Sequence, residues 1–160
     1  LGLRLLNGSI EALLPEDARL WLENRYFLPQ PRLDLGSRLI GHAHACMDIS
    51  DGLVQDLAHI CHASEVAGVI EKQKLPVSAA AQLLLQQDEN LWHHVFTGGD
   101  DYELLFTAPP SQHMAITAIA EALHLSLSVI GRIEEGSGVT VRDSEGDVIT
   151  ISSGGYNHFT

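Results

Sequence analysis

The stretch Met47–Leu53, with the sequence Met-Asp-Ile-Ser-Asp-Gly-Leu, constrains the fold most because it joins two kinds of secondary structure. The small and apolar residues 43–47 before it are typical of a short strand. Apolar residues at helical spacing follow it, namely Leu53, Leu57, Ile60 and Cys61. The pattern predicts a strand, a turn and a helix over 51–63, with Ser50 as the N-cap and Asp51 in the first turn.

The carboxylates of this stretch are more numerous than a helix cap requires. A cap needs one oxygen, yet Asp48 adds a second carboxylate close to Asp51. Two neighbouring acids repel each other unless a cation or a proton lies between them. A hard divalent ion with oxygen ligands meets that need. The alternative for Ser50 and Asp51 is that they only cap the helix.

A second acidic stretch, Gly98–Leu104, has the sequence Gly-Gly-Asp-Asp-Tyr-Glu-Leu. Two glycines allow a tight and closely packed backbone. The residues 102–107 that follow predict a strand, so Asp100 and Asp101 lie at its entrance. The alternative is a solvated turn, since this composition is common in turns.

The rest of the chain predicts an α+β fold. Helices are expected over 15–25, 78–87 and 111–123, and further strands over 66–71, 127–133, 139–142 and 148–151. This order indicates helices that cover a mixed β-sheet in layers. A length of 160 residues suits one domain. We expect residues 1–28 to be a helical lead-in and residues 29–160 to form the domain.

Charge and cysteine content exclude several classes of protein. A net charge of −12 with no basic cluster argues against a nucleic-acid partner or an anionic membrane surface. It does not argue against ATP, because metal ions can bridge carboxylate and phosphate groups. The two cysteines, Cys46 and Cys61, have neither metal-type spacing nor a disulfide framework, which fits a reducing compartment. No membrane span or signal peptide is expected.

The nine histidines do not form the pattern of a zinc site. His59 and His62 share one face of the expected helix, but no third ligand follows at the spacing of a tetrahedral zinc site. Ordinary surface or core histidines are therefore expected. The chain also has neither a phosphate-binding P-loop sequence nor the protein-kinase signatures.

The two acidic stretches, together with Gly155-Tyr156-Asn157-His158-Phe159, closely resemble the thiamine-monophosphate kinase family. The resemblance is to the C-terminal half of the family and runs from about Leu28 to Phe159. This family is grouped with aminoimidazole ribonucleotide synthetase and selenophosphate synthetase. The resemblance implies a layered α/β/α, partly ferredoxin-like fold. It also implies transfer of the ATP γ-phosphoryl group to thiamine monophosphate, giving thiamine diphosphate and ADP with Mg²⁺ in the cytoplasm.

The resemblance also implies roles for individual residues. Asp48 and Asp51 match the magnesium ligands, and Ser50 matches a serine that contacts ATP. Asp100 and Tyr156 match residues that contact the substrate, although the family often has Glu at the position of Asp100. No catalytic base is expected, since the attacking phosphate is already largely ionised near neutral pH.

The resemblance further implies an N-terminal domain outside this chain and a homodimer of the full-length protein. Residues 1–160 alone are therefore expected to be inactive. Two other hypotheses stay open at this point. One is an ATP-dependent enzyme of the same superfamily with a different acceptor, and the other is a non-catalytic metal- or nucleotide-binding module.

Overall fold

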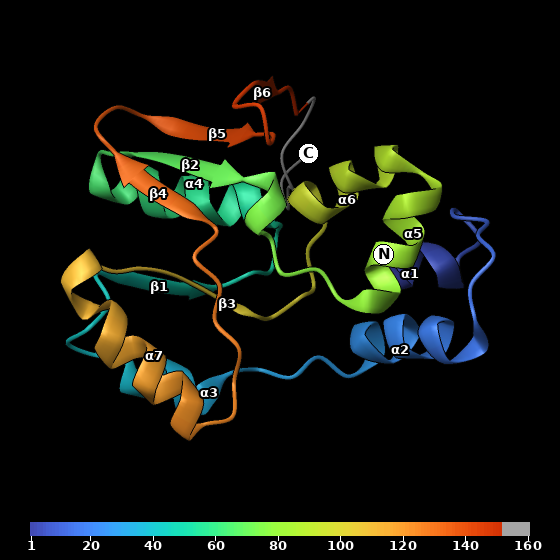
Figure 1. Ribbon diagram of the computed structural model, residues 1–160, viewed down its shortest axis with the longest axis horizontal. Helices are drawn as coiled ribbons and strands as arrows, with labels where there is room; N and C mark the ends of the chain where they lie inside the picture. Colours follow the sequence, from blue (N-terminus) through green and yellow to red (C-terminus); the bar gives the residue numbers. More distant parts are fainter. Residues whose placement is uncertain (152–160) are drawn as a thin grey trace.

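The computed structural model describes residues 1–151, in which six strands form two sheets (Figure 1). The smaller sheet pairs β1 (Ala45–Asp48) with β3 (Leu104–Thr107) in antiparallel register, with Met47 opposite Leu105. The larger sheet has the strand order β4-β2-β5-β6. Its strands are β4 (Gly131–Glu134), β2 (Ala67–Glu71), β5 (Gly138–Arg142) and β6 (Val148–Ile149). β2 runs antiparallel to β4 and parallel to β5, so this sheet is mixed.

Helix α4 (Leu53–Ser64) packs against both sheets and forms the centre of the core. The apolar face that its sequence predicts is buried: Leu53, Leu57, Ile60 and Cys61 are at most 7 % exposed. These side chains pack with Ile70 of β2, Val141 of β5 and Leu105 of β3. One helix thereby fixes the position of the β1–β3 pair relative to the mixed sheet.

The two faces of the β1–β3 pair contact different helices because side chains alternate along a strand. Leu105 faces α4, whereas Leu104 and Phe106 pack in a second cluster. That cluster contains residues of α3 (Leu33–Arg38) and α7 (His113–Ala122), which lie together below the pair in Figure 1. The order of layers is thus mixed sheet, α4, β1–β3 pair, then α3 and α7.

A third cluster joins the start of the chain to its middle. It unites α1 (Gly2–Leu6) and α2 (Glu16–Phe27) with α5 (Ala79–Gln87) through Leu5, Leu22 and Leu84. The Gln87 side chain of α5 donates to the Leu13 carbonyl oxygen at 3.0 Å and accepts from the Leu13 amide at 3.2 Å. Helix α6 (Trp92–Thr97) follows and leads into the glycine pair of the second acidic stretch.

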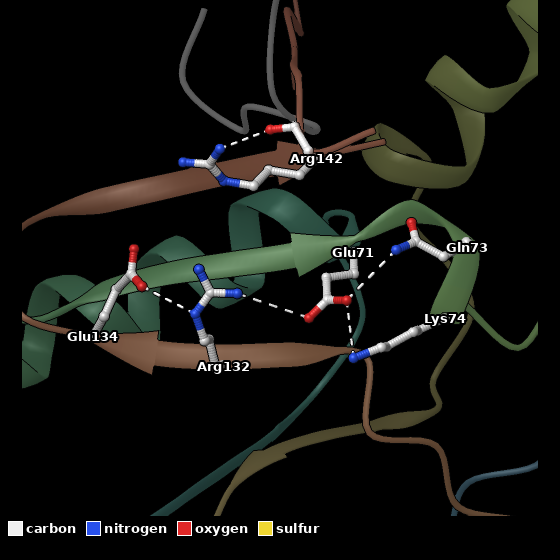
Figure 2. A network of polar contacts seen from close by, with 7 residues as sticks. Glu71, Gln73, Lys74, Arg132, Glu134 and Arg142 are labelled. Atoms are coloured by element: carbon white, nitrogen blue, oxygen red, sulfur yellow. Dashed lines mark hydrogen bonds and ion pairs between the residues drawn. The ribbon is translucent and has the colours of Figure 1, made fainter. Parts of the chain in front are cut away.

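Polar contacts on the mixed sheet link β2 to β4 (Figure 2). Glu71, the last residue of β2, pairs with Lys74 at 2.9 Å and with Arg132 of β4 at 3.8 Å. Arg132 also contacts Glu134 at 3.0 Å. Because Lys74 and Arg132 are about half exposed, these pairs add little to stability. Among residues 1–151, no helix is long and apolar enough to cross a bilayer.

The expected α+β class, with helices covering a mixed sheet, is confirmed. The expected strand over 127–133 is shorter, and β4 begins only at Gly131. Leu127 packs into the cluster of α3 and α7, whereas Ile130 packs into the α4 cluster. Residues 127–130 therefore cross from the layer of α3 and α7 to the layer of α4. Their apolar side chains are spaced for packing into these two clusters, and the segment does not pair as a strand.

Candidate functional site

The two acidic stretches lie side by side because the β1–β3 ladder continues beyond both strands. Asp48, the last residue of β1, is opposite Leu104, the first residue of β3. Past this pair, the Ile49 amide donates to the Glu103 carbonyl oxygen and the Tyr102 amide donates to the Ile49 carbonyl oxygen, both at 2.9 Å. The Asp100 amide then donates to the Ser50 carbonyl oxygen at 3.1 Å. Four of the five predicted site residues, Asp48, Ser50, Asp51 and Asp100, are thus held at one end of the β1–β3 pair.

Glycine makes this close approach possible. A Cβ atom on Gly99 would overlap the Ser50 carbonyl oxygen. Gly52 has a φ of +123°, and a Cβ atom there would lie 2.7 Å from the Thr97 carbonyl oxygen. Both positions therefore require a residue without a side chain.

The prediction that Ser50 caps the following helix is wrong. Helix α4 begins at Leu53, and its N-cap is Gly52, so Asp51 precedes the helix and is not part of its first turn. No side chain caps α4, and Asp56 of α4 instead binds the backbone of the loop before the helix. Its Oδ2 atom accepts from the amides of Ser50, Asp51 and Gly52 at 2.9, 3.2 and 3.2 Å. One buried carboxylate therefore fixes the loop that carries the other acids.

Sequence reasoning missed Asp56, although a signal was present. Asp56 lies on the buried face of α4 and is only 1 % exposed. An acid on an otherwise apolar helix face is expensive to bury unless it has hydrogen-bond donors. That position alone pointed to a structural or ligand-binding role.

The second stretch holds its acid in an unusual backbone conformation. Asp100 and Tyr102 have φ values of +64° and +53°, a region that non-glycine residues rarely adopt. The Tyr102 hydroxyl donates to Asp100 Oδ1 at 3.3 Å. The charge of Asp100 and this hydrogen bond raise the pKa of Tyr102, and the charge of Asp48 adds a smaller effect. This tyrosine therefore contacts the acid of its own stretch and feels the charge of the other.

Glu103 anchors the site to α2 and the segment after it. Arg32 donates from Nε and Nη2 to the two carboxylate oxygens of Glu103 at 2.8 and 2.7 Å, and Arg25 of α2 donates at 2.7 Å. Partial burial favours a higher pKa for Glu103, but the bonds and charges of the two arginines outweigh it and lower the pKa. Glu103 therefore supports the structure of the site.

The four predicted site residues at this end of the β1–β3 pair all have side-chain oxygen atoms. Asp48 and Asp100 are exposed, and Ser50 and Asp51 are half-buried. Mg²⁺ prefers oxygen ligands such as carboxylates, so Asp48 and Asp51 could hold that ion. Tyr156, the fifth predicted site residue, lies outside the described residues 1–151.

One protein family matches most of the chain. Residues 16–144, which include both acidic stretches, match the family described as AIR synthase related protein, C-terminal domain. The chain belongs to this family. The chain is also similar to thiamine-monophosphate kinase of Haemophilus influenzae. The two sequences are 37% identical over 144 residues, which are 87% of this chain and 43% of the relative.

Two solved structures are similar to this AIR synthase related domain in both sequence and fold. The crystal structure of thiamine-monophosphate kinase from Stenotrophomonas maltophilia K279a is 40% identical with a TM-score of 0.80, over 92% of this chain and 46% of that chain. AaThiL complexed with AMPPCP and TMP is 34% identical with a TM-score of 0.76, over 99% of this chain and 47% of that chain. The chain thus spans about half the length of these relatives.

Proposed function

We propose that this AIR synthase related domain is the C-terminal half of a thiamine-monophosphate kinase. The full-length enzyme transfers the γ-phosphoryl group of ATP to thiamine monophosphate and releases thiamine diphosphate and ADP. The observation that carries the proposal is the hydrogen bond from the Asp100 amide to the Ser50 carbonyl oxygen. It joins the stretch assigned to metal and ATP to the stretch assigned to the substrate. The similarity to AaThiL complexed with AMPPCP and TMP supports the same ligand pair.

The family resemblance suggests a role for each residue. Asp48 and Asp51 hold Mg²⁺, which would neutralise phosphate charge when bound. Ser50 contacts ATP from the loop between them. Asp100 and Tyr156 contact thiamine monophosphate. The chain supplies no base, because the attacking phosphate oxygen is largely ionised near neutral pH and the barrier is chiefly one of alignment and charge repulsion.

This chain covers about half the length of its relatives, and that coverage supports a second domain in the full-length protein. Residues 29–160 form the C-terminal domain, and residues 1–28 form the junction to an N-terminal domain that completes the ATP site. The full-length protein is a homodimer of the cytoplasm, without a nucleic-acid or membrane partner. The acidic net charge of −12 and the two unpaired cysteines support that placement.

The test is an assay of the full-length protein with ATP, Mg²⁺ and a set of phosphorylated acceptors. We expect thiamine diphosphate from thiamine monophosphate, and no comparable transfer to pyridoxal phosphate or a ribonucleotide. Transfer to another acceptor in preference to thiamine monophosphate would indicate a different enzyme of the superfamily. Metal binding without any transfer would indicate a non-catalytic module.

A further inference from the structure

Three residues around the start of α4 form a cluster that includes one of the proposed magnesium ligands and two other side chains. Asp51, Asp56 and His59 each place one potential ligand atom within 4.8 Å of the others. Asp56 and His59 are three positions apart on α4, so their side chains share one face of the helix. Asp51 approaches from the loop that Asp56 fixes through Oδ2.

Asp56 supplies an independent reason to expect a ligand here. Its side chain is 1 % exposed, and Oδ2 takes all three amide hydrogen bonds. The other oxygen, Oδ1, is buried and has no hydrogen-bond partner among the residues that the structure describes. A buried carboxylate oxygen without a donor is costly, and in native proteins it points to a water or an ion.

The chemistry of the three groups favours a particular class of ion. Two carboxylates and one imidazole make a mixed oxygen and nitrogen set, which suits first-row transition metals better than Mg²⁺. Ligands of a six-coordinate ion at about 2.1 Å lie up to about 4.2 Å apart, and the three ligand atoms here lie within 4.8 Å of one another, close to that separation. Solvent can occupy the remaining positions on the side of the exposed His59.

We propose that Asp51, Asp56 and His59 bind a divalent first-row transition-metal ion, such as Mn²⁺, Co²⁺ or Zn²⁺. The site shares Asp51 with the proposed magnesium site and adds two residues of α4. It requires neither ATP nor thiamine monophosphate, so it stands or falls separately from the kinase activity. His59 provides the selectivity, because it is the one nitrogen donor of the three.

The test is a titration of the full-length protein with Co²⁺ in the presence of excess Mg²⁺, followed by visible absorption. The variant is His59→Gln, which changes an exposed side chain. The matched control is His62→Gln, an exposed histidine one turn further along α4 and outside the cluster. Far-ultraviolet circular dichroism checks that all three proteins are folded.

We expect wild type and His62→Gln to bind one Co²⁺ ion with the same affinity and the same absorption bands. His59→Gln should bind it at least about tenfold more weakly, since changes even in the surroundings of metal ligands cost that much. Equal Co²⁺ binding by all three proteins, equal weakening in both variants, or displacement of all Co²⁺ by Mg²⁺ would overturn the proposal.

Discussion

At the scale of the residue, a single carboxylate organises the loop that bears the site. Asp56 accepts hydrogen bonds from three consecutive amides of this loop through one oxygen. Ser50 does not cap α4, whose N-cap is Gly52. The roles expected for Asp48, Ser50, Asp51, Asp100 and Tyr156 remain predictions, although the first four lie at the same end of the β1–β3 pair.

The importance of Asp56 can be measured by its removal. We predict that Asp56→Ala lowers the free energy of unfolding by about 3 kcal/mol, at about 1 kcal/mol for each hydrogen bond lost. Asp17→Ala is the matched control, because Asp17 is an exposed acid in the first turn of α2. It should cost under about 1 kcal/mol through the helix dipole. Equal values for the two variants from urea unfolding would show that Asp56 does not organise the loop.

At the scale of the element, the sequence predicted most helices and strands but not how they pair. Helix α4 was expected over 51–63 and is Leu53–Ser64, because its apolar spacing is clear. That β1 pairs with β3, and β2 with β5, could not be read from the chain, since such pairs join residues distant in sequence. The closeness of the two acidic stretches depends on the first of these pairings, and the sequence suggested it only through a family resemblance.

The pairing of the acidic stretches requires Gly99. We predict that Gly99→Ala lowers the free energy of unfolding by about 1–3 kcal/mol, because the added Cβ overlaps the backbone of Ser50. Gly36→Ala is the control, since its Cβ would lie 3.6 Å from a Leu104 methyl group, an ordinary contact. Gly36 is inside α3, so alanine there should be neutral or slightly stabilising. A Gly99→Ala protein as stable as wild type would mean that the two loops are further apart than described.

The link from α2 to β3 should depend on pH. The arginines hold the pKa of Glu103 below its ordinary value of 4.5, so the folded state binds a proton less readily than the unfolded state. The resulting stability is complete above pH 4.5 and is lost as the pH falls through the folded-state pKa. We predict that Glu103→Gln costs about 1 kcal/mol at neutral pH. The difference from wild type should shrink in acid below that range.

The comparison for Glu103 is Glu134→Gln, which removes an exposed ion pair with Arg132. Glu134→Gln should change the free energy of unfolding by no more than about 0.5 kcal/mol, both at neutral pH and in acid. Urea unfolding at several pH values measures both variants. A Glu103→Gln deficit that stays constant in acid would contradict the assigned ion pairs.

At the scale of the whole molecule, one layer, the β1–β3 pair, carries both acidic stretches at one of its ends. Helix α4 joins the mixed sheet to the β1–β3 pair, and that pair ends in the two acidic stretches. The α+β class was predictable because the order of elements limits the possible layers. The division into two sheets was not, because the strand lengths and patterns alone do not say which strands share a sheet.

The central claim is that Asp48 belongs to a magnesium site that serves phosphoryl transfer. The most direct measurement is the rate of thiamine diphosphate formation by full-length Asp48→Asn, with Asp147→Asn as a control in an exposed turn of the mixed sheet. Loss of metal-based charge stabilisation worth several kcal/mol predicts a fall of at least about a hundredfold for Asp48→Asn, with folding intact and the control unchanged. A rate for folded Asp48→Asn equal to that of Asp147→Asn would contradict the account.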